Sequence, residues 1–422
     1  MTGTMRYSCL RCGASYSAET AIDSRGCPAC ASTAPANLTI VKDDRAAVRA
    51  IQEDTLPSLW RYARDLPCPA ACAVSLGEGL TPLAPAPAIG AQVGVPRLLI
   101  KNEGCNPTWS HKDRFSTVAV SFAKAAGASV VATASSGNAG ASLAAYAARA
   151  GLNCIVATFS GAAGPMLAQI RKYGATLVPF VHKEDRWRFI AEGAERFGWF
   201  AASPCHAPVV GSHPVGIAGY KTLAYEIVEQ LNGAAPEWCA LPVCYGDALI
   251  GLWQGFEDLF HRGEIAQLPR LIAAEVHGSL AAALAGESDR LPDMTARFKP
   301  LAGSIGATRS TYQALKALRQ SRGVAVPVGN EGLIELQETL ARKEGILAEL
   351  SSVTPFAAIA DLRGRNVIAA SDRVVVVVTG SGLKDFDRSI SPDAEVPSFP
   401  TVRDAWNYLR EEALEKAFGT FA

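Results

Sequence analysis

One lysine of this sequence, Lys112, stands in a setting that suits covalent chemistry. It lies in the turn-rich stretch Asn106-Pro-Thr-Trp-Ser-His-Lys112-Asp-Arg114, which leads into a helix predicted over residues 116–126. An amine just before a helix feels the positive end of the helix dipole, and partial burial removes its hydration. Both effects favour the neutral amine, which is the form that attacks an aldehyde. The alternative is an ordinary surface lysine paired with Asp113.

Two further segments place polar groups at the ends of strands. In Thr133-Ala-Ser135-Ser-Gly137-Asn138-Ala-Gly140, small residues join a strand to a helix. They let backbone N–H groups approach an anion, here a carboxylate, and Asn138 can donate to a phenolate oxygen. In Thr379-Gly-Ser381-Gly-Leu-Lys-Asp385, a hydroxyl follows a strand directly and can donate to a ring nitrogen. Taken singly, each segment is only a loop.

The N-terminal region carries four cysteines in two pairs. Cys9-Leu-Arg-Cys12 and Cys27-Pro-Ala-Cys30 can each turn two thiolates to one side. Four thiolates complete a tetrahedral zinc site that leaves no position for water or substrate, so the expected zinc is structural. The alternative is four unrelated cysteines, or a ribbon that has lost its metal. Residues 1–42 are therefore predicted to form a zinc-ribbon-like segment with the ligands Cys9, Cys12, Cys27 and Cys30.

The elements that must position these groups alternate along the chain. Continuous apolar strands separated by helices predict parallel sheets that are covered on both faces. The predicted strands are residues 98–101, 130–133, 154–158, 176–181, 238–243, 271–276 and 374–378. The predicted helices are residues 44–52, 116–126, 139–150, 165–173, 223–231, 249–260, 332–343 and 355–362.

This pattern has too many units for a single small sheet. We therefore expect an α/β protein with two three-layer α/β/α domains besides the small zinc ribbon. The larger domain is predicted to contain residues 43–115 and 225–422, and the smaller one residues 116–224.

Composition narrows the possible partners and compartments. The 422 residues include 40 basic and 40 acidic side chains, so no nucleic acid is expected as a partner. The N-terminus lacks the pattern of a secretory signal, and no apolar run approaches the roughly 18 residues that cross a membrane. Eleven cysteines without an export signal favour a reducing compartment, so we expect a cytoplasmic protein without membrane attachment.

The three chemical segments together resemble the threonine synthases of the fold-type II pyridoxal-phosphate (PLP) enzymes. The resemblance runs from about Gly77 to Phe386, and includes Gly77-Glu-Gly-Leu-Thr-Pro-Leu83 and the Gly-x-Lys-Thr-x-x-x-Glu run from Gly216 to Glu226. It implies a homodimer that acts on a small amino acid, and some members of the family carry a zinc-ribbon-like N-terminus.

The resemblance also implies roles for individual residues. Lys112 would form the Schiff base with PLP, Asn138 would contact the cofactor's O3′, and Thr379 would bond the pyridine nitrogen. The α-carboxylate of the substrate would be held by Ser135, Ser136 and Gly137. The loop that holds the cofactor's phosphate would consist of Cys244, Tyr245, Gly246, Asp247 and Ala248, with one glycine where several are expected. As a helix N-cap, Asp247 would turn its carboxylate away from that phosphate.

Two departures concern the substrate. Trp109 and His111 flank Ser110 where the family commonly has glycine and phenylalanine, which suggests a smaller or more apolar pocket. His111 is either a second acid–base group or a packing residue. The segment from Ser160 to Gln169 lacks a lysine that threonine synthases often place before the glutamine. A phosphorylated substrate needs cationic partners, for which Arg149 and Lys101 are the candidates.

The implied chemistry is elimination or replacement rather than transamination. PLP is an electron sink, and the freed Lys112 amine can act as a general base at the α-carbon. A hydroxyl beside the ring nitrogen leaves that nitrogen largely unprotonated, which favours loss of a leaving group. The first hypothesis is conversion of O-phosphohomoserine to threonine and phosphate. The second is β-elimination or β-replacement on serine, phosphoserine or a related amino acid, as in ammonia-lyases and cysteate synthases. A remote third is a zinc-ribbon binding protein with a degenerate enzyme body.

Overall fold

The computed structural model describes residues 5–20, 22–42, 56–286, 288–386 and 397–410. Contacts divide the chain into two units, Met1–Phe386 and Asp387–Ala422. In the second unit, helix α13 (Val402–Tyr408) follows Thr401, whose hydroxyl accepts from the N–H of Asp404 at 3.2 Å. The helix predicted over residues 44–52 lies outside the described residues.

The largest sheet has six strands, in the order β12 (Val324–Pro327), β11 (Arg270–Glu275), β10 (Trp238–Pro242), β13 (Val374–Val378), β5 (Leu98–Asn102) and β4 (Leu83–Pro85). All neighbouring strands are parallel except β4, which runs antiparallel to β5. Strand β13 consists of five buried valines between β10 and β5. A strand that is covered on both faces buries all of its side chains, and this explains the continuous apolar run.

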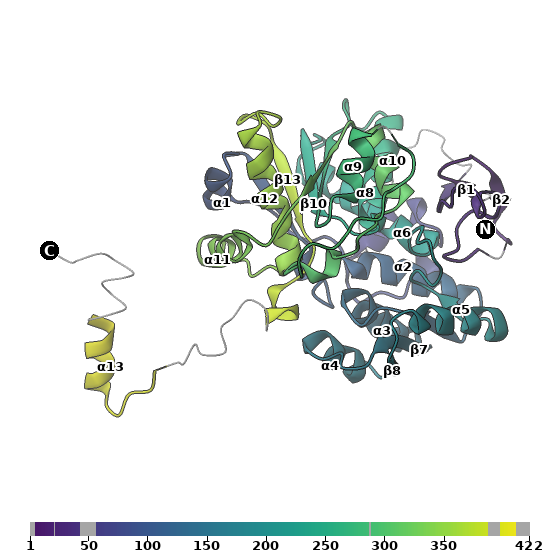
Figure 1. Ribbon diagram of the computed structural model, residues 1–422, viewed down its shortest axis with the longest axis horizontal. Coiled ribbons are helices and arrows are strands. Elements are labelled where there is room, and N and C mark those ends of the chain that lie inside the picture. Colours follow the sequence, from purple (N-terminus) through teal and green to yellow (C-terminus); the bar gives the residue numbers. More distant parts are fainter. Residues whose placement is uncertain (1–4, 21, 43–55, 287, 387–396, 411–422) are drawn as a thin grey trace. The chain divides into compact units, whose positions relative to one another are not determined.

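Successive residues of β13 point to opposite faces of this sheet. Val374, Val376 and Val378 belong to one hydrophobic cluster, with the helices α1 (Pro87–Gln92), α11 (Leu333–Glu344) and α12 (Leu350–Gly364). Val375 and Val377 belong to another, with the helices α8 (Asp247–His261), α9 (Ser279–Ala285) and α10 (Tyr312–Gln320). Figure 1 shows α11 and α12 on one side of β13 and β10, and α8 to α10 on the other. The sheet is thus the middle of three layers.

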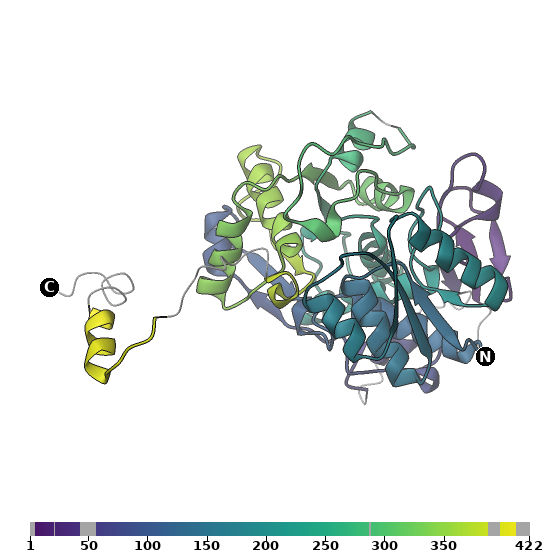
Figure 2. The ribbon, with the colours of Figure 1, turned by 60° about the horizontal axis from the view of Figure 1, so that its bottom comes forward.

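A second sheet has four parallel strands, in the order β8 (Thr176–Phe180), β7 (Asn153–Phe159), β6 (Val130–Thr133) and β9 (Phe200–Ala201). On one face it packs against α2 (Lys112–Ala125), α3 (Asn138–Ala150) and α4 (Pro165–Lys172), and on the other against α5 (Asp185–Phe197). Figure 2 brings these helices and strands to the front. The two sheets with their helices confirm the predicted pair of α/β/α layers. The domain boundaries predicted from the sequence stay a prediction.

A small antiparallel sheet of β2 (Ser15–Ser17), β1 (Met5–Cys9) and β3 (Leu38–Lys42) holds the N-terminal cysteines. Asn37, just before β3, donates from Nδ2 to the side-chain oxygen of Gln313 at 3.0 Å and to the carbonyl of Ser212 at 3.0 Å. These buried bonds attach the cysteine-bearing sheet to the residues around α10 and α6 (Pro214–Ile217).

The predicted elements agree with the structure where the apolar pattern is strong. The strands predicted over 130–133 and 374–378 coincide with β6 and β13. The helix predicted over 355–362 begins earlier, at Leu350, so Pro355 lies inside α12. A proline has no N–H for the carbonyl of Ser351, and the hydroxyl of Thr354 donates to that carbonyl instead, at 2.8 Å. Another helix of the structure is α7 (Lys221–Gln230). The sequence analysis did not predict the helices α5, α9 and α10 or the strand β12.

Candidate active site

Lys112 is the first residue of α2, four residues before the predicted start of that helix. It is half-buried, and its Nζ lies 5.7 Å from the ring centre of Tyr220. The residue before it, His111, donates its backbone N–H to the carbonyl of Thr379 at 2.8 Å. Lys112 and Thr379, which are 267 residues apart in the sequence, are therefore neighbours at the ends of α2 and β13.

The His111 side chain is part of the same contact. Its Nδ1 lies 3.0 Å from the carbonyl of Thr379, and its ring stacks on Tyr220 with centroids 5.5 Å apart. Burial and the nearby charge of Lys112 hold the pKa of His111 well below its usual range. The neutral ring with Nδ1 protonated suits the carbonyl acceptor, so this arrangement favours the packing role over the acid–base role.

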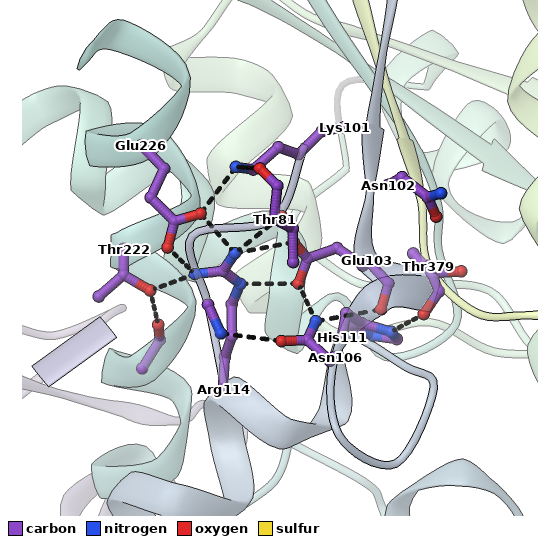
Figure 3. Close-up of polar contacts among 12 residues, drawn as sticks. Thr81, Lys101, Asn102, Glu103, Asn106, His111, Arg114, Thr222, Glu226 and Thr379 are labelled. Atoms are coloured by element: carbon purple, nitrogen blue, oxygen red, sulfur yellow. Dashed lines mark hydrogen bonds and ion pairs between the residues drawn. The ribbon is translucent and has the colours of Figure 1, made fainter. Parts of the chain in front are cut away.

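Arg114 anchors the start of α2 through a buried ion-pair network (Figure 3). Its Nε donates to Glu103 at 2.7 Å, and its Nη1 donates to Glu226 at 2.5 Å and to Thr222 at 2.9 Å. Although burial works in the opposite direction, Arg114 and Lys101 together lower the pKa of Glu226 to about 2. The Lys-Asp-Arg stretch and the Gly-x-Lys-Thr-x-x-x-Glu run thus meet in space, which fixes the segment that carries Lys112.

Neither of the two predicted substrate cations is available to a ligand beside Lys112. Lys101 is fully buried, and its Nζ donates to Glu226 at 2.7 Å, to the carbonyl of Thr81 at 2.7 Å and to Gln230 at 2.9 Å. Its three hydrogen-bond donors are therefore engaged. Arg149 is exposed in the last turn of α3, about 16 Å along the helix from Asn138 at the rise of an α-helix. We retain neither residue in the substrate site.

The segment from Ser135 to Asn138 joins β6 to α3, as predicted. Ser135, Ser136 and Gly137 are half-exposed, and Asn138 is buried as the first residue of α3. A Cβ at Gly140 would lie 1.9 Å from the carbonyl oxygen of Ser135, so only glycine lets the loop approach the helix this closely. The local geometry therefore explains why this segment is rich in small residues.

A carboxylate that the sequence analysis missed lies between Asn138 and Thr379. Glu349 is buried, and its Oε2 accepts from Nδ2 of Asn138 at 2.8 Å, while its Oε1 accepts from the hydroxyl of Thr379 at 3.4 Å. Burial raises the pKa of Glu349. The nearby positive charges of Lys384 and Lys112 partly offset this rise. No motif surrounds this glutamate in the sequence, since its partners come from the ends of α3 and β13.

A second buried carboxylate, Asp113, supports the loop before α2. It accepts from the backbone N–H of Thr108 at 2.6 Å, from the Thr108 hydroxyl at 2.5 Å and from the Ser142 hydroxyl at 2.6 Å. Burial raises the pKa of Asp113 to about 6. Its partners are backbone and hydroxyl groups, so the surface pairing of Lys112 with Asp113 considered from the sequence does not occur. The buried Lys384, whose pKa burial lowers to about 8, donates to Gln169 at 2.8 Å.

The predicted phosphate loop follows β10 and opens α8. Gly246 has a left-handed φ of 75°, and a Cβ there would lie 2.4 Å from the Cβ of Ala314, so glycine is required at this position. Asp247 is not the N-cap of α8, because Gly246 holds that position and no side chain caps the helix. The Asp247 carboxylate instead accepts from Ser212 Oγ at 2.6 Å and from Gln313 Nε2 at 2.6 Å. These partners on neighbouring segments satisfy the Asp247 carboxylate in place of the helix N–H groups that the predicted cap would have used.

A small cavity lies beside the lysine. Its lining residues come from β6, from the helices α2, α3 and α8, and from the segments around Ser203 and Tyr220. They are Lys112, Phe115, Thr133, Ala139, Leu143, Ala202, Ser203, Ser212, Tyr220 and Asp247. Trp109 does not line it, because that side chain is 48% exposed and its backbone adopts a left-handed φ of 66°. The expectation that Trp109 narrows the pocket has no support in this geometry.

Several groups at this site fit PLP. Within the described chain, Nζ of Lys112 makes no hydrogen bond or ion pair, and the buried Oγ of Ser110 has no partner. The Nδ2 group of Asn138 uses one of its two N–H donors on Glu349. The first N–H groups of a helix lack intrahelical acceptors, and those of Asp247 and Ala248 find no other acceptor among the described residues. An amine, unpaired polar atoms and a helix N-terminus are what an aldehyde with a phosphate requires.

The four N-terminal cysteines form a compact cluster. The sulfur atoms of Cys9 and Cys30 are 3.8 Å apart, as are those of Cys12 and Cys27, and all four lie within 4.8 Å of one another. Four zinc–sulfur bonds of about 2.3 Å in a tetrahedron place their sulfurs about 3.8 Å apart. The cluster therefore has the dimensions of a structural zinc site.

Comparison with known proteins agrees with this fold. A family model described as "Pyridoxal-phosphate dependent enzyme" matches residues 74–380, and the chain belongs to that family. This range contains Lys112, Asn138, Glu349 and Thr379.

Within that family the chain is related to curated threonine synthases. It is 33% identical to the threonine synthase of Methanocaldococcus jannaschii over 93% of this chain and 96% of the relative. It is 32% identical to that of Methanosarcina acetivorans over 97% and 98% of the two chains. The resemblance predicted from the motifs is confirmed.

Solved structures share the fold at lower identity. An L-serine ammonia-lyase from Rhizomucor miehei has a TM-score of 0.61 at 19% identity, covering 74% of this chain and 96% of that one. Maize serine racemase has a TM-score of 0.61 at 18% identity, covering 72% and 88%. In the part of the chain that the structure describes, no helix has both the length and the apolar character to cross a membrane.

Proposed function

We propose that this chain is a PLP-dependent lyase that converts O-phosphohomoserine to threonine and phosphate. The carrying observation is the group of Lys112, Asn138 and Thr379, which the backbone of His111 and the carboxylate of Glu349 connect. The names of the curated relatives support the choice of reaction, since they share 32% and 33% identity with nearly the whole chain.

In this proposal each residue has a role toward the cofactor. Lys112 holds PLP through its amine, Asn138 faces the O3′ oxygen and Thr379 faces the ring nitrogen. The N–H groups of Asp247 and Ala248 hold the phosphate, with Cys244, Tyr245 and Gly246 as the loop around it. When bound, PLP supplies an electron sink for carbanion chemistry.

The protein residues also act on the substrate. Ser135, Ser136 and Gly137 hold its α-carboxylate by hydroxyl and backbone N–H groups at the N-terminus of α3. The Lys112 amine takes the proton from the α-carbon, beside the cavity that this lysine lines. A neutral hydroxyl at Thr379 favours departure of a leaving group over transamination.

Other parts of the proposal concern the whole protein. The cysteine cluster holds one structural zinc ion through Cys9, Cys12, Cys27 and Cys30, and the enzyme works as a cytoplasmic homodimer without nucleic-acid partners. The metal, the compartment and the dimer are predictions made from the sequence that metal analysis, cell fractionation and light scattering test.

A second candidate function is β-elimination or β-replacement on serine, phosphoserine or a related amino acid. It is favoured by the segment between Ser160 and Gln169, which lacks a lysine and brings the uncharged Met166 next to Gly137. A Cβ on Gly137 would lie 3.8 Å from the Met166 sulfur. An apolar thioether there suits a smaller substrate better than a phosphorylated one.

Product analysis separates the two functions. Purified enzyme with O-phosphohomoserine should release phosphate and threonine in equal amounts, and should form little ammonia or pyruvate from serine or phosphoserine. Lys112→Ala should lose both turnover and the visible absorbance of the bound cofactor. The proposal fails if wild-type enzyme produces no threonine, or if the Lys112→Ala variant retains both properties.

A further inference from the structure

A negatively charged group on the substrate would find few available cations at this site. Lys101 is engaged in the Arg114 network, and Arg149 lies at the far end of α3. Lys384 is buried, donates to Gln169 at 2.8 Å, and has the carboxylates of Asp113 and Glu349 near it, which act to raise its pKa against the effect of burial. Lys112 is reserved for the cofactor in the proposed function. A different cation is therefore needed if the substrate carries a second anionic group.

Arg186, in the first turn of α5, reaches the edge of the site. Its Nη1 donates to the carbonyl of Ala134 at 3.3 Å, and Ala134 leads directly into the segment Ser135–Gly137 that faces the α-carboxylate. The N–H of Ala134 donates to Oγ of Ser203 at 3.0 Å, and Ser203 lines the cavity with Lys112. The guanidinium thus lies beside the residue that leads into the carboxylate loop, and Ala134 connects it to Ser203, which lines the cavity.

The guanidinium of Arg186 is not neutralised by the protein. Its Nε donates to the carbonyl of Lys183 at 2.9 Å, so two of its five N–H groups are used by backbone carbonyls. No carboxylate lies within ion-pair distance of it in the described part of the chain, whereas Arg188 on the same helix pairs with Glu192 at 3.1 Å. Three N–H groups in a planar fork remain for an anion.

The surroundings of Arg186 strengthen its attraction for an anion. The side chain is half-buried, and burial lowers the pKa of Arg186, while Glu184 and Tyr245 work in the opposite direction. The guanidinium remains charged at any working pH, since its ordinary pKa is far above neutrality. A half-buried charge is screened less than an exposed one, so it binds an anion more strongly.

We propose that Arg186 binds a phosphate or carboxylate at the side-chain end of the amino-acid substrate and thereby selects substrates with a second negative charge. This inference rests on the proposed function, because it assumes that the α-carboxylate occupies the segment Ser135–Gly137. In this proposal the cation from α5 takes the role of the lysine that the segment before Gln169 lacks.

Binding of unreactive amino acids tests the role of Arg186 apart from turnover. Calorimetry on the cofactor-loaded enzyme compares the affinities of 2-amino-5-phosphonopentanoate, 2-aminoadipate and norvaline, whose side chain is uncharged. Arg186→Gln should weaken binding of the phosphonate by about 10- to 100-fold, the range for a hydrogen bond to a charged group. Norvaline should bind equally to both proteins, and Arg186→Lys should retain part of the preference. The ratio between phosphonate and 2-aminoadipate tells whether the group is a phosphate or a carboxylate.

The control is Arg188→Gln, which removes the same charge from an exposed position of the same helix and should leave all three affinities unchanged. Titration with PLP in the dark should give the same affinity for wild type and Arg186→Gln. The inference is wrong if Arg186→Gln weakens norvaline and phosphonate equally, or if it weakens PLP while the preference for the phosphonate persists.

The outcomes separate the two proposals. If wild type forms threonine from O-phosphohomoserine and Arg186→Gln leaves its KM unchanged, the role of Arg186 fails while the proposed function stands. If wild type forms no threonine but prefers the phosphonate through Arg186, the proposed function fails and the anion site stands.

Discussion

Asn138 donates a hydrogen bond from Nδ2 to Oε2 of Glu349 at 2.8 Å and so joins the first residue of α3 to the residue before α12. The two helices cover different sheets, and Thr379 reaches the same carboxylate from β13. Glu349 is therefore the group that connects both residues assigned to the cofactor ring. In the proposed function Glu349 positions these two residues, whereas Lys112 would perform the proton transfer.

Glu349→Gln tests this positioning role. The amide keeps the volume but removes the charge and turns one acceptor into a donor, which opposes the hydroxyl of Thr379. We expect kcat to fall by at least about tenfold, which is the effect of one misplaced hydrogen bond. The melting temperature should change little, because burial raises the pKa of Glu349 and already disfavours its charged form. Steady-state kinetics and thermal unfolding measure both. Unchanged kcat would show that Asn138 and Thr379 are held without it.

Glu226→Gln tests the ion-pair network below the lysine. The substitution leaves Arg114 and Lys101 buried with Glu103 as their remaining carboxylate. Breaking a buried pair from one side costs about 3–5 kcal/mol of unfolding free energy. Urea denaturation measures the loss, with Glu229→Gln as the control because Glu229 lies on the same helix and is 36% exposed. A similar effect of both substitutions would contradict the special role of the buried network.

The buried Asp113 predicts an unusual dependence of stability on pH. Its pKa is raised from 3.8 to about 6, so the folded protein retains a proton there that the unfolded chain releases. As the pH rises through this window the folded state therefore loses stability, by about 3 kcal/mol in total, and the contribution is constant above it. Denaturation curves from pH 4 to pH 7 should show this loss for wild type relative to Asp113→Asn. Parallel curves for the two proteins would exclude it.

Removal of the predicted zinc should destabilise the N-terminal sheet. We expect one zinc ion per chain by elemental analysis, and a lower melting temperature after treatment with a strong chelator, because the four thiolates tie β1 to the turn before β3. Cys12→Ser should lose most of the metal, whereas Cys105→Ser, another exposed cysteine outside the cluster, should keep it. Full zinc content in Cys12→Ser would argue against the four-thiolate site.

The sequence by itself determined the fold class, and it named the residues to which the proposed function gives the chemistry. Thr379 directly follows β13, and Asn138 begins the helix after β6, so their positions beyond strands with a strong apolar pattern were predictable. Lys112 begins α2, four residues before the predicted start of that helix. The paired spacing of the four N-terminal cysteines was equally local. Such features depend on neighbours a few residues away, and the sequence contains them directly.

Only the tertiary structure decided which partners the polar residues have. From the sequence, Lys101 was a candidate for binding the substrate. In the structure it is buried and donates to Glu226, 125 residues further along the chain. Glu349 had no motif, and Asp247 faces Ser212 and Gln313 instead of capping α8. The physical reason is that a charged or polar side chain takes its pKa and its role from the groups around it, and packing brings those groups from distant parts of the chain.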